Sequence, residues 1–217
     1  RDMRRINGLW KYMPLTALLA IVASAAMAGV PLLNGFLSKE MFFAEALNAR
    51  AFGTAAAAMV PIAATFAGIF SVAYSTRFVH DVFFNGQPVG LPKTPHEPPR
   101  FMKVPVEILV VLCIVVGVAP ALTVGGLVAL AAGAVLGGPL PEYTLAIWHG
   151  FNLPLLMSAI AIAGGLLMYW LLQRRYDLHL HVPSGWTARL VFQHAMDGLF
   201  RVAGLATAKT ENGSLQR

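Results

Sequence analysis

A stretch of 26 residues without one charged side chain, residues 12–37, constrains the fold of this chain more than any other feature. A helix needs about 20 apolar residues to cross the hydrocarbon core of a bilayer, so this stretch is long enough to span a membrane. The sequence Gly-Val-Pro-Leu-Leu-Asn-Gly at residues 29–35 should interrupt that helix. The apolar sequence then resumes as Phe-Leu-Ser-Lys-Glu-Met-Phe-Phe, which places Lys39 just beyond the interruption.

The composition indicates a membrane protein with several spans. Of the 217 residues, 57% are hydrophobic and 12% are charged, whereas a soluble domain has about 25% charged residues. The net charge of +6 therefore describes where Lys and Arg lie relative to the spans, and nucleic acid is not an expected partner.

The sequence lacks the common signatures of soluble enzymes. It contains no G-x-G-x-x-G, no G-x-x-x-x-G-K-[ST], no H-E-x-x-H and no C-x-x-C motif. Its one cysteine, Cys113, cannot form an internal disulfide. We therefore expect neither enzymatic activity nor a cofactor or metal site.

The apolar pattern predicts an all-α bundle of four spans within residues 1–175. The spans are expected at residues 12–49 (broken), 55–80, 104–120 and 150–173. Beyond Pro120, proline and paired glycines predict a bend and a short peripheral helix that ends near residue 136. The proline-rich connection 85–105 is expected to be an extended loop.

The distribution of basic residues predicts the orientation of these spans. Lys and Arg are concentrated before the first span, in the connection after the second and behind the fourth, while the turn at 139–148 has none. Basic loops face the cytoplasm, so both ends of the chain are predicted to be cytoplasmic. The chain opens with Arg rather than Met, and we expect it to be truncated at both ends.

The tail, residues 184–209, has a different pattern. Apolar residues share one face of the predicted helix and polar residues share the other, and Ser184 is its expected N-cap. Such a helix is too polar to span. It is expected to lie along the membrane surface or against neighbouring subunits; packing on a further domain would give the same pattern.

Two interpretations of Lys39 follow from the sequence. In the first, Gly29, Pro31 and Gly35 open the backbone at membrane depth, which is tolerated only beside protein or a water-filled cavity. Burial then favours the neutral amine, so Lys39 can accept and release a proton. In the second, the helix ends earlier, and Lys39 and Glu40 are interfacial residues whose side chains reach the headgroups.

Other polar residues in or near the spans are weaker candidates for a polar path. Glu40, Ser71 and Tyr74 can line such a path, although serine and tyrosine commonly satisfy local backbone or pack between helices. His149 can transfer protons but also suits an interface beside a tryptophan. His80 and Asp81 close the second span and are expected at the surface.

The motifs resemble one known family. Residues 29–43 resemble the broken-helix segment in the large A subunit of the multi-subunit (Mrp-type) monovalent cation/proton antiporters. Residues 148–154 (Trp-His-Gly-Phe-Asn-Leu-Pro) and 211–216 (Glu-Asn-Gly-Ser-Leu-Gln) resemble later stretches of the same polypeptide. The antiporter-like subunits of respiratory complex I share the broken helix but resemble the later stretches less.

This resemblance implies a role for the broken helix. Lys39 falls on the family's lysine of the discontinuous helix, near the outward end of a buried polar axis. The family's central glutamate and lysines lie upstream of Arg1. The residues expected to support the break are Gly29, Pro31, Asn34 and Gly35.

The resemblance also implies a function and a location. We expect a multi-pass protein of the bacterial inner membrane that exchanges protons for Na⁺ or another monovalent cation, together with other membrane subunits. One alternative is a proton-pumping subunit of a respiratory redox complex. Another is a membrane anchor that holds partner subunits without transport.

Overall fold

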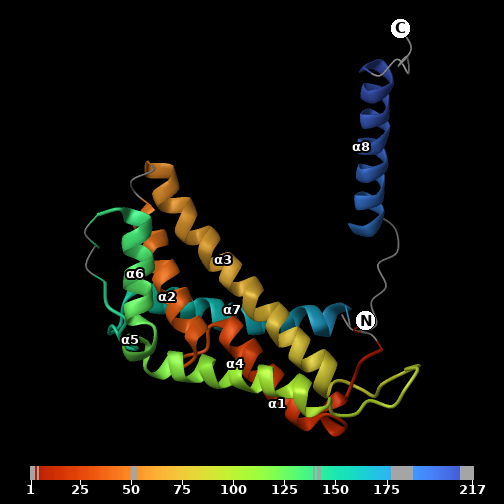
Figure 1. Ribbon diagram of the computed structural model, residues 1–217, viewed down its shortest axis with the longest axis horizontal. Coiled ribbons are helices and arrows are strands. Elements are labelled where there is room, and N and C mark those ends of the chain that lie inside the picture. Colours follow the sequence, from red (N-terminus) through yellow and green to blue (C-terminus); the bar gives the residue numbers. More distant parts are fainter. Residues whose placement is uncertain are drawn as a thin grey trace. The chain divides into compact units, whose positions relative to one another are not determined.

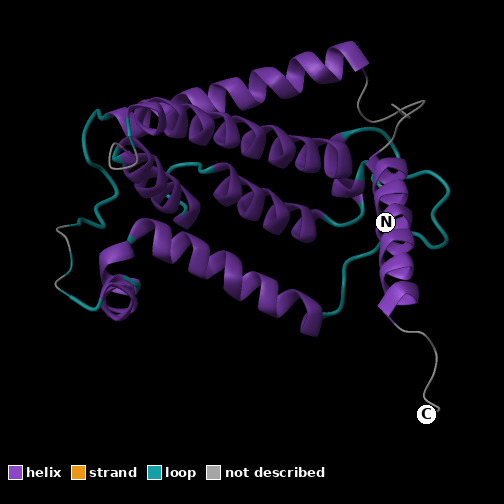
Figure 2. Cartoon of the chain, turned by 90° about the horizontal axis from the view of Figure 1, so that it is seen from above, coloured by secondary structure: helices purple, strands orange, loops and turns teal. Residues whose placement is uncertain are grey.

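Helices account for all regular structure in the part of the chain that the structure describes. This computed structural model describes residues 3, 5–49, 53–138, 140, 143–176 and 188–210 (Figures 1 and 2). The chain divides into two compact units, Arg1–His179 and Leu180–Arg217. The all-α class predicted from the sequence is confirmed.

The first unit is a helical bundle. Helices α3, α4 and α7 are each long and apolar enough to cross a membrane, while α1 and α6 are shorter apolar helices. Its elements in chain order are η1 (Leu9–Lys11), α1 (Pro14–Ala28), α2 (Asn34–Leu47), α3 (Thr54–Val79), the π-helical turn η3 (His80–Phe84), α4 (Arg100–Val118), α5 (Pro120–Thr123), α6 (Gly125–Leu136) and α7 (Leu153–Tyr176).

The first predicted span is discontinuous, as the sequence indicated. Helix α1 ends at Gly29, whose φ of 80° lies in the left-handed region that glycine adopts without a steric penalty. Leu32 also has a positive φ of 69°, which is uncommon for a residue with a side chain. Helix α2 begins only at Asn34, so five residues separate the two halves.

Small residues allow α3 and α7 to pack closely, and this is the most extensive helix pair of the unit. A Cβ atom added to Gly165 would lie 2.5 Å from the Val72 Cβ, and one added to Gly68 would lie 2.9 Å from the Ala161 Cβ. Phe43 of α2 is fully buried and packs in the same core. The second half of the broken helix is therefore held inside the bundle.

The proline-rich connection contacts the start of α1 through Glu97. The Glu97 carboxylate accepts hydrogen bonds from the backbone amides of Leu15 (2.8 Å) and Thr16 (3.2 Å) and from the Thr16 hydroxyl (2.7 Å). These amides belong to the first turn of α1, where no helical carbonyl is available to them. A residue distant in the sequence thus caps the first span.

The end of α3 differs from the sequence-based expectation. Asp81 is only 1% exposed, so its predicted position at the surface is wrong, whereas His80 is exposed. After α4 the chain bends at Ala119 and continues through α5 into the 12-residue α6.

The second unit contains helix α8 (Ala188–Thr210). Its apolar side chains, which include Phe192 and Leu199, are exposed, as expected for an amphipathic helix considered by itself. The predicted N-cap Ser184 and the motif at 211–216 lie outside the described residues.

Candidate functional site

Lys39 points back to the interruption that precedes it. Its Nζ donates a hydrogen bond to the Ala28 carbonyl at 2.8 Å, and the side chain is half-buried. A Cβ atom added to Gly29 would lie 2.7 Å from the Lys39 Cδ, and one added to Gly68 would lie 3.7 Å from the Lys39 Cε. Since Gly68 is near the middle of α3, Lys39 lies at mid-height of that helix.

All four terminal carbonyls of α1 have partners. The backbone amides of Val30 and Gly29 donate to the first two, at 2.9 Å and 3.0 Å. Ser71 of α3 donates to the Met27 carbonyl at 3.0 Å, and Lys39 donates to the fourth. The freed backbone of the break is therefore satisfied by protein, as a helix end at membrane depth requires.

Two opposing effects act on the charge of Lys39. The carbonyl end of α1 carries a partial negative charge that favours a cation, whereas the half-buried position disfavours one. The geometry therefore suits proton exchange as well as a purely structural cap.

Helix α4 supports the break in a way that the sequence did not indicate. The Cys113 thiol donates to the Asn34 Oδ1 at 2.8 Å, and Gly117 lies so close to the backbone of Leu32 and Leu33 that no Cβ would fit. Gly35 is similarly close to the Ala26 carbonyl. A glycine within an apolar helix is typical of close helix packing, but it does not indicate which segment of the chain the glycine meets.

Pro31 lies in the turn between the two half-helices. Its backbone nitrogen has no hydrogen to donate, and its ring disfavours continuation of a helix through the preceding turn. The four residues predicted to support the break thus all lie at or beside it.

Glu40 belongs to a different group of polar residues. It is 5% exposed, and its Oε1 accepts a hydrogen bond from the Asn152 side chain at 3.4 Å. The His149 Nδ1 lies 4.0 Å from the Glu40 Oε2. These residues line a cavity of about 210 Å³ together with Tyr143 and Thr144. Glu40 is therefore buried inside the bundle, and the segment before α7 supplies its partners.

Ser71 and Tyr74 lie on the Lys39 side of the broken helix. The Ser71 hydroxyl approaches the Tyr74 hydroxyl at 3.5 Å while it caps the Met27 carbonyl. Tyr74 is half exposed. The structure thus gathers Lys39, Ser71 and Tyr74 near the end of α1, and Glu40 with His149 near the start of α7.

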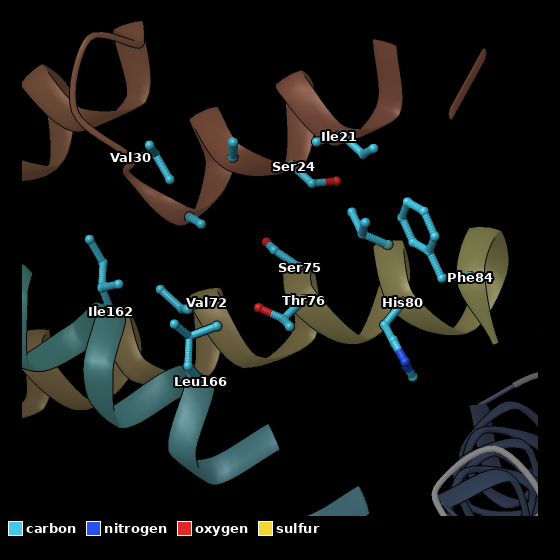
Figure 3. A pocket seen from close by; sticks show the side chains of 13 residues that line it. Ile21, Ser24, Val30, Val72, Ser75, Thr76, His80, Phe84, Ile162 and Leu166 are labelled. Carbon is cyan, nitrogen blue, oxygen red and sulfur yellow. The ribbon is translucent and has the colours of Figure 1, made fainter. Parts of the chain in front are cut away.

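A cavity of about 400 Å³ lies between α1, α3 and α7 (Figure 3). Ser75 projects from α3 towards α1, and its buried hydroxyl has no hydrogen-bond partner among the described residues. The other lining side chains are mainly apolar, and cavities of this kind hold water poorly. We therefore do not assign the cavity to the polar path.

Comparisons with known proteins agree with this fold and site. A family model described as "NADH:quinone oxidoreductase/Mrp antiporter, TM" matches residues 1–66. A probable K(+)/H(+) antiporter A/B protein of Rhizobium meliloti is 53% identical over 173 residues, which are 80% of this chain and 17% of that protein. The A subunit of the Na(+)/H(+) antiporter of Bacillus subtilis is 31% identical over 206 residues, covering 88% of this chain and 25% of that protein.

A solved structure gives the same result. The Mrp complex from Dietzia sp. matches with a TM-score of 0.64 and 32% identity, over 92% of this chain and 21% of the matched chain. The fold and these similarities thus define a multi-pass bacterial membrane protein. The chain belongs to the family of Mrp-type antiporter A subunits, and it spans between about a sixth and a quarter of the length of these relatives.

Proposed function

We propose that this chain forms part of one subunit of a monovalent cation/proton antiporter and carries the outer part of its proton path. The observation that carries the proposal is the hydrogen bond from the Lys39 Nζ to the Ala28 carbonyl at the break. Relatives named as components of K(+)/H(+) and Na(+)/H(+) antiporters support the reaction class. The exchanged ions are a proton and Na⁺ or another monovalent cation, and the partners are further membrane subunits.

Lys39 acts as the residue that changes protonation. In its charged form the amine caps the carbonyl end of α1, where the helix dipole stabilises it. When the helix dipole or the hydration around the Lys39 amine changes, the amine releases a proton. The neutral amine can then stay half-buried at a low cost in desolvation free energy. The break matters because it provides both the carbonyl and the space for this side chain.

Glu40 and His149 form the outward end of the path in this proposal. By the predicted orientation, α1 begins in the cytoplasm, so the end of α2 and the start of α7 face outwards. The Glu40 Oε2, which has no hydrogen-bond partner among the described residues, faces His149 across 4.0 Å. A single water or a small side-chain movement would connect these two groups for proton transfer.

Substitution of Lys39 by arginine distinguishes a role in proton exchange from a role as a structural cap of α1. In the full-length complex, Lys39→Arg keeps a positive donor for the Ala28 carbonyl but does not release a proton at working pH. We expect Lys39→Arg and Lys39→Ala both to lower cation-dependent proton flux in membrane vesicles by about 10²-fold or more. Complex assembly should persist in both.

The matched control is Lys93→Ala, which removes an exposed lysine in the connection between α3 and α4. It should leave both flux and assembly unchanged. If Lys39→Arg supports normal flux, Lys39 is a structural cap and the membrane-anchor interpretation is favoured. For the alternative of a redox-driven pump, no specific observation among the described residues provides support.

A further inference from the structure

A buried carboxylate lies just beyond the C-terminal end of α3. Asp81 belongs to η3, a π-helical turn, and π-helical turns occur frequently at functional sites. With 1% of its surface exposed, this side chain needs either protein partners or a proton to offset the loss of water. Neither the break nor the Glu40 cavity involves it.

The two carboxylate oxygens of Asp81 have separate partners. The Arg77 Nε donates to Oδ2 at 3.3 Å. The Tyr169 hydroxyl donates to Oδ1 at 3.1 Å, and the Asn85 side chain donates to the same atom at 3.4 Å. Because Tyr169 belongs to α7, the network joins the most extensively packed helix pair of the unit at one end.

His80 completes the network on its exposed side. Its Nδ1 lies 2.8 Å from the Tyr169 hydroxyl and 3.5 Å from the Asp81 Oδ1. The His80 side chain is 47% exposed, and Figure 3 shows its ring turned away from the apolar cavity. Tyr169 therefore connects an accessible imidazole to a carboxylate that solvent does not reach.

We propose that Asp81 is a second protonation site of this protein, loaded from the cytoplasmic side through His80 and Tyr169. The His80 imidazolium gives its Nδ1 proton to the Tyr169 oxygen, while the Tyr169 hydroxyl proton passes to the Asp81 Oδ1. One N–H and one O–H bond break, and two O–H bonds form. The products are a neutral imidazole, an unchanged tyrosine and a neutral carboxylic acid.

The surroundings permit Asp81 to alternate between charged and neutral. Arg77 is 42% exposed, so its guanidinium keeps water as an alternative partner when Asp81 is neutral. The 3-10 helix η1 also packs on η3, where the Trp10 and Phe84 rings stack with centroids 5.3 Å apart. Lys11, the charged residue of η1, is exposed. Among the described residues, the titratable or charged groups that contact the carboxylate are thus Arg77, His80 and Tyr169.

The role of Asp81 in transport rests on the proposed function, because Asp81 would pass cytoplasmic protons to or from the path that includes Lys39. Its protonation can be measured without transport. Infrared difference spectra of the full-length complex at decreasing pH should show a carboxylic acid C=O band that is absent in Asp81→Asn. The exposed Asp197 of α8 provides the control Asp197→Asn, which should retain the band.

Tyr169→Phe tests the relay while it preserves ring packing between α3 and α7. After a rapid drop in pH, the band should appear about 10²-fold more slowly in Tyr169→Phe and in His80→Gln, because each variant removes one proton carrier. The control Tyr12→Phe changes an exposed tyrosine and should leave the rate unchanged. A band that persists in Asp81→Asn, or normal loading in both relay variants, overturns the inference.

Lys39→Ala distinguishes this inference from the proposed function. It should abolish exchange and leave the Asp81 band intact. If exchange survives in Lys39→Ala while the band remains, the proposed function fails but the protonation site stands. If the Asp81 band is missing while Lys39→Ala abolishes exchange, the protonation site fails and the proposed function stands.

Discussion

At the scale of single residues, the break depends on backbone conformations that side chains rarely adopt. Gly29 has a positive φ and lies against the Lys39 side chain. Alanine at this position would cost roughly 1–2 kcal/mol for the left-handed conformation alone, and its Cβ would displace the Lys39 stem. The position therefore controls both stability and the placement of the amine.

We accordingly expect Gly29→Ala to lower the thermal unfolding midpoint and to reduce proton flux in the full-length complex. Gly53→Ala is the matched control, because Gly53 also has a positive φ but has nothing within 4 Å of an added Cβ. Both variants should lose stability, but only Gly29→Ala should lose flux. If proton flux is the same in the two variants, the placement of the Lys39 side chain does not control transport.

Glu97 gives a residue-scale prediction about pH. Partial burial acts to raise the pKa of its carboxyl group, but hydrogen bonds from Thr16 and Leu15, together with nearby Lys103, hold the pKa below its ordinary value of 4.5. A carboxyl group whose folded pKa is depressed stabilises the fold above its unfolded pKa and loses that contribution as pH falls through the folded value.

The variant Glu97→Gln should therefore unfold at a lower temperature than the wild type at neutral pH. Glutamine retains an oxygen that accepts hydrogen bonds but loses the negative charge, which at a helix N-terminus contributes about 0.3–1 kcal/mol. The difference in unfolding midpoint should shrink as pH falls from about 4 towards the depressed pKa of the folded wild type, because the wild-type carboxylate becomes protonated over this range. Thermal unfolding in detergent across this pH range checks the prediction; a difference that stays constant with pH would contradict it.

At the scale of helices, the close packing of α3 against α7 positions two polar groups. One is Lys39, which lies beside Gly68 of α3, and the other is the network of Asp81 and Tyr169. Gly165 leaves no space for a side chain beside Val72 and the Ile69 carbonyl. Overpacking of a tightly packed core typically costs about 1–3 kcal/mol. We expect Gly165→Leu to destabilise the bundle and to separate Tyr169 from Asp81.

The measurable result of Gly165→Leu is a lower unfolding midpoint together with slower loading of Asp81. Gly126→Leu on α6 is its control, because a Cβ there meets nothing within 4 Å and the substitution should be tolerated. If Gly165→Leu loses stability but loads Asp81 normally, the α3–α7 contact is not what positions the network.

At the scale of the whole molecule, the predicted orientation places the connection between α3 and α4 in the cytoplasm and the segment before α7 outside. In a full-length background in which Cys113 and any other cysteine are replaced by alanine, His96→Cys should react with a membrane-impermeant thiol reagent only from the cytoplasmic side. Ala146→Cys should react only from the outside. Neither native residue is buried, so labelling of intact cells and inverted vesicles gives a direct comparison. If the labelling is reversed, Glu40 lies on the cytoplasmic side of the membrane and Asp81 on the outer side.

Residue patterns along the chain were sufficient for the break and for most of the helices. The expected extended loop 85–105 is wrong at its end, because α4 begins at Arg100 and contains Pro105 in its first two turns. Apolar length, a Gly/Pro interruption and loop charges are local properties, and each has a direct physical consequence for a chain in a bilayer. The discontinuous helix, the short α6 and the family resemblance at Lys39 therefore followed from the sequence.

Tertiary structure alone decided which distant residues meet. No local pattern indicated that Cys113 and Gly117 would support the break, that Glu97 would cap α1, or that Asp81 would be buried beside Tyr169. These contacts depend on how separate helices pack, because packing brings together side chains that the chain itself keeps far apart. Asp81 is the clearest example, because it is buried although its position at the end of a span predicted that it would lie at the surface.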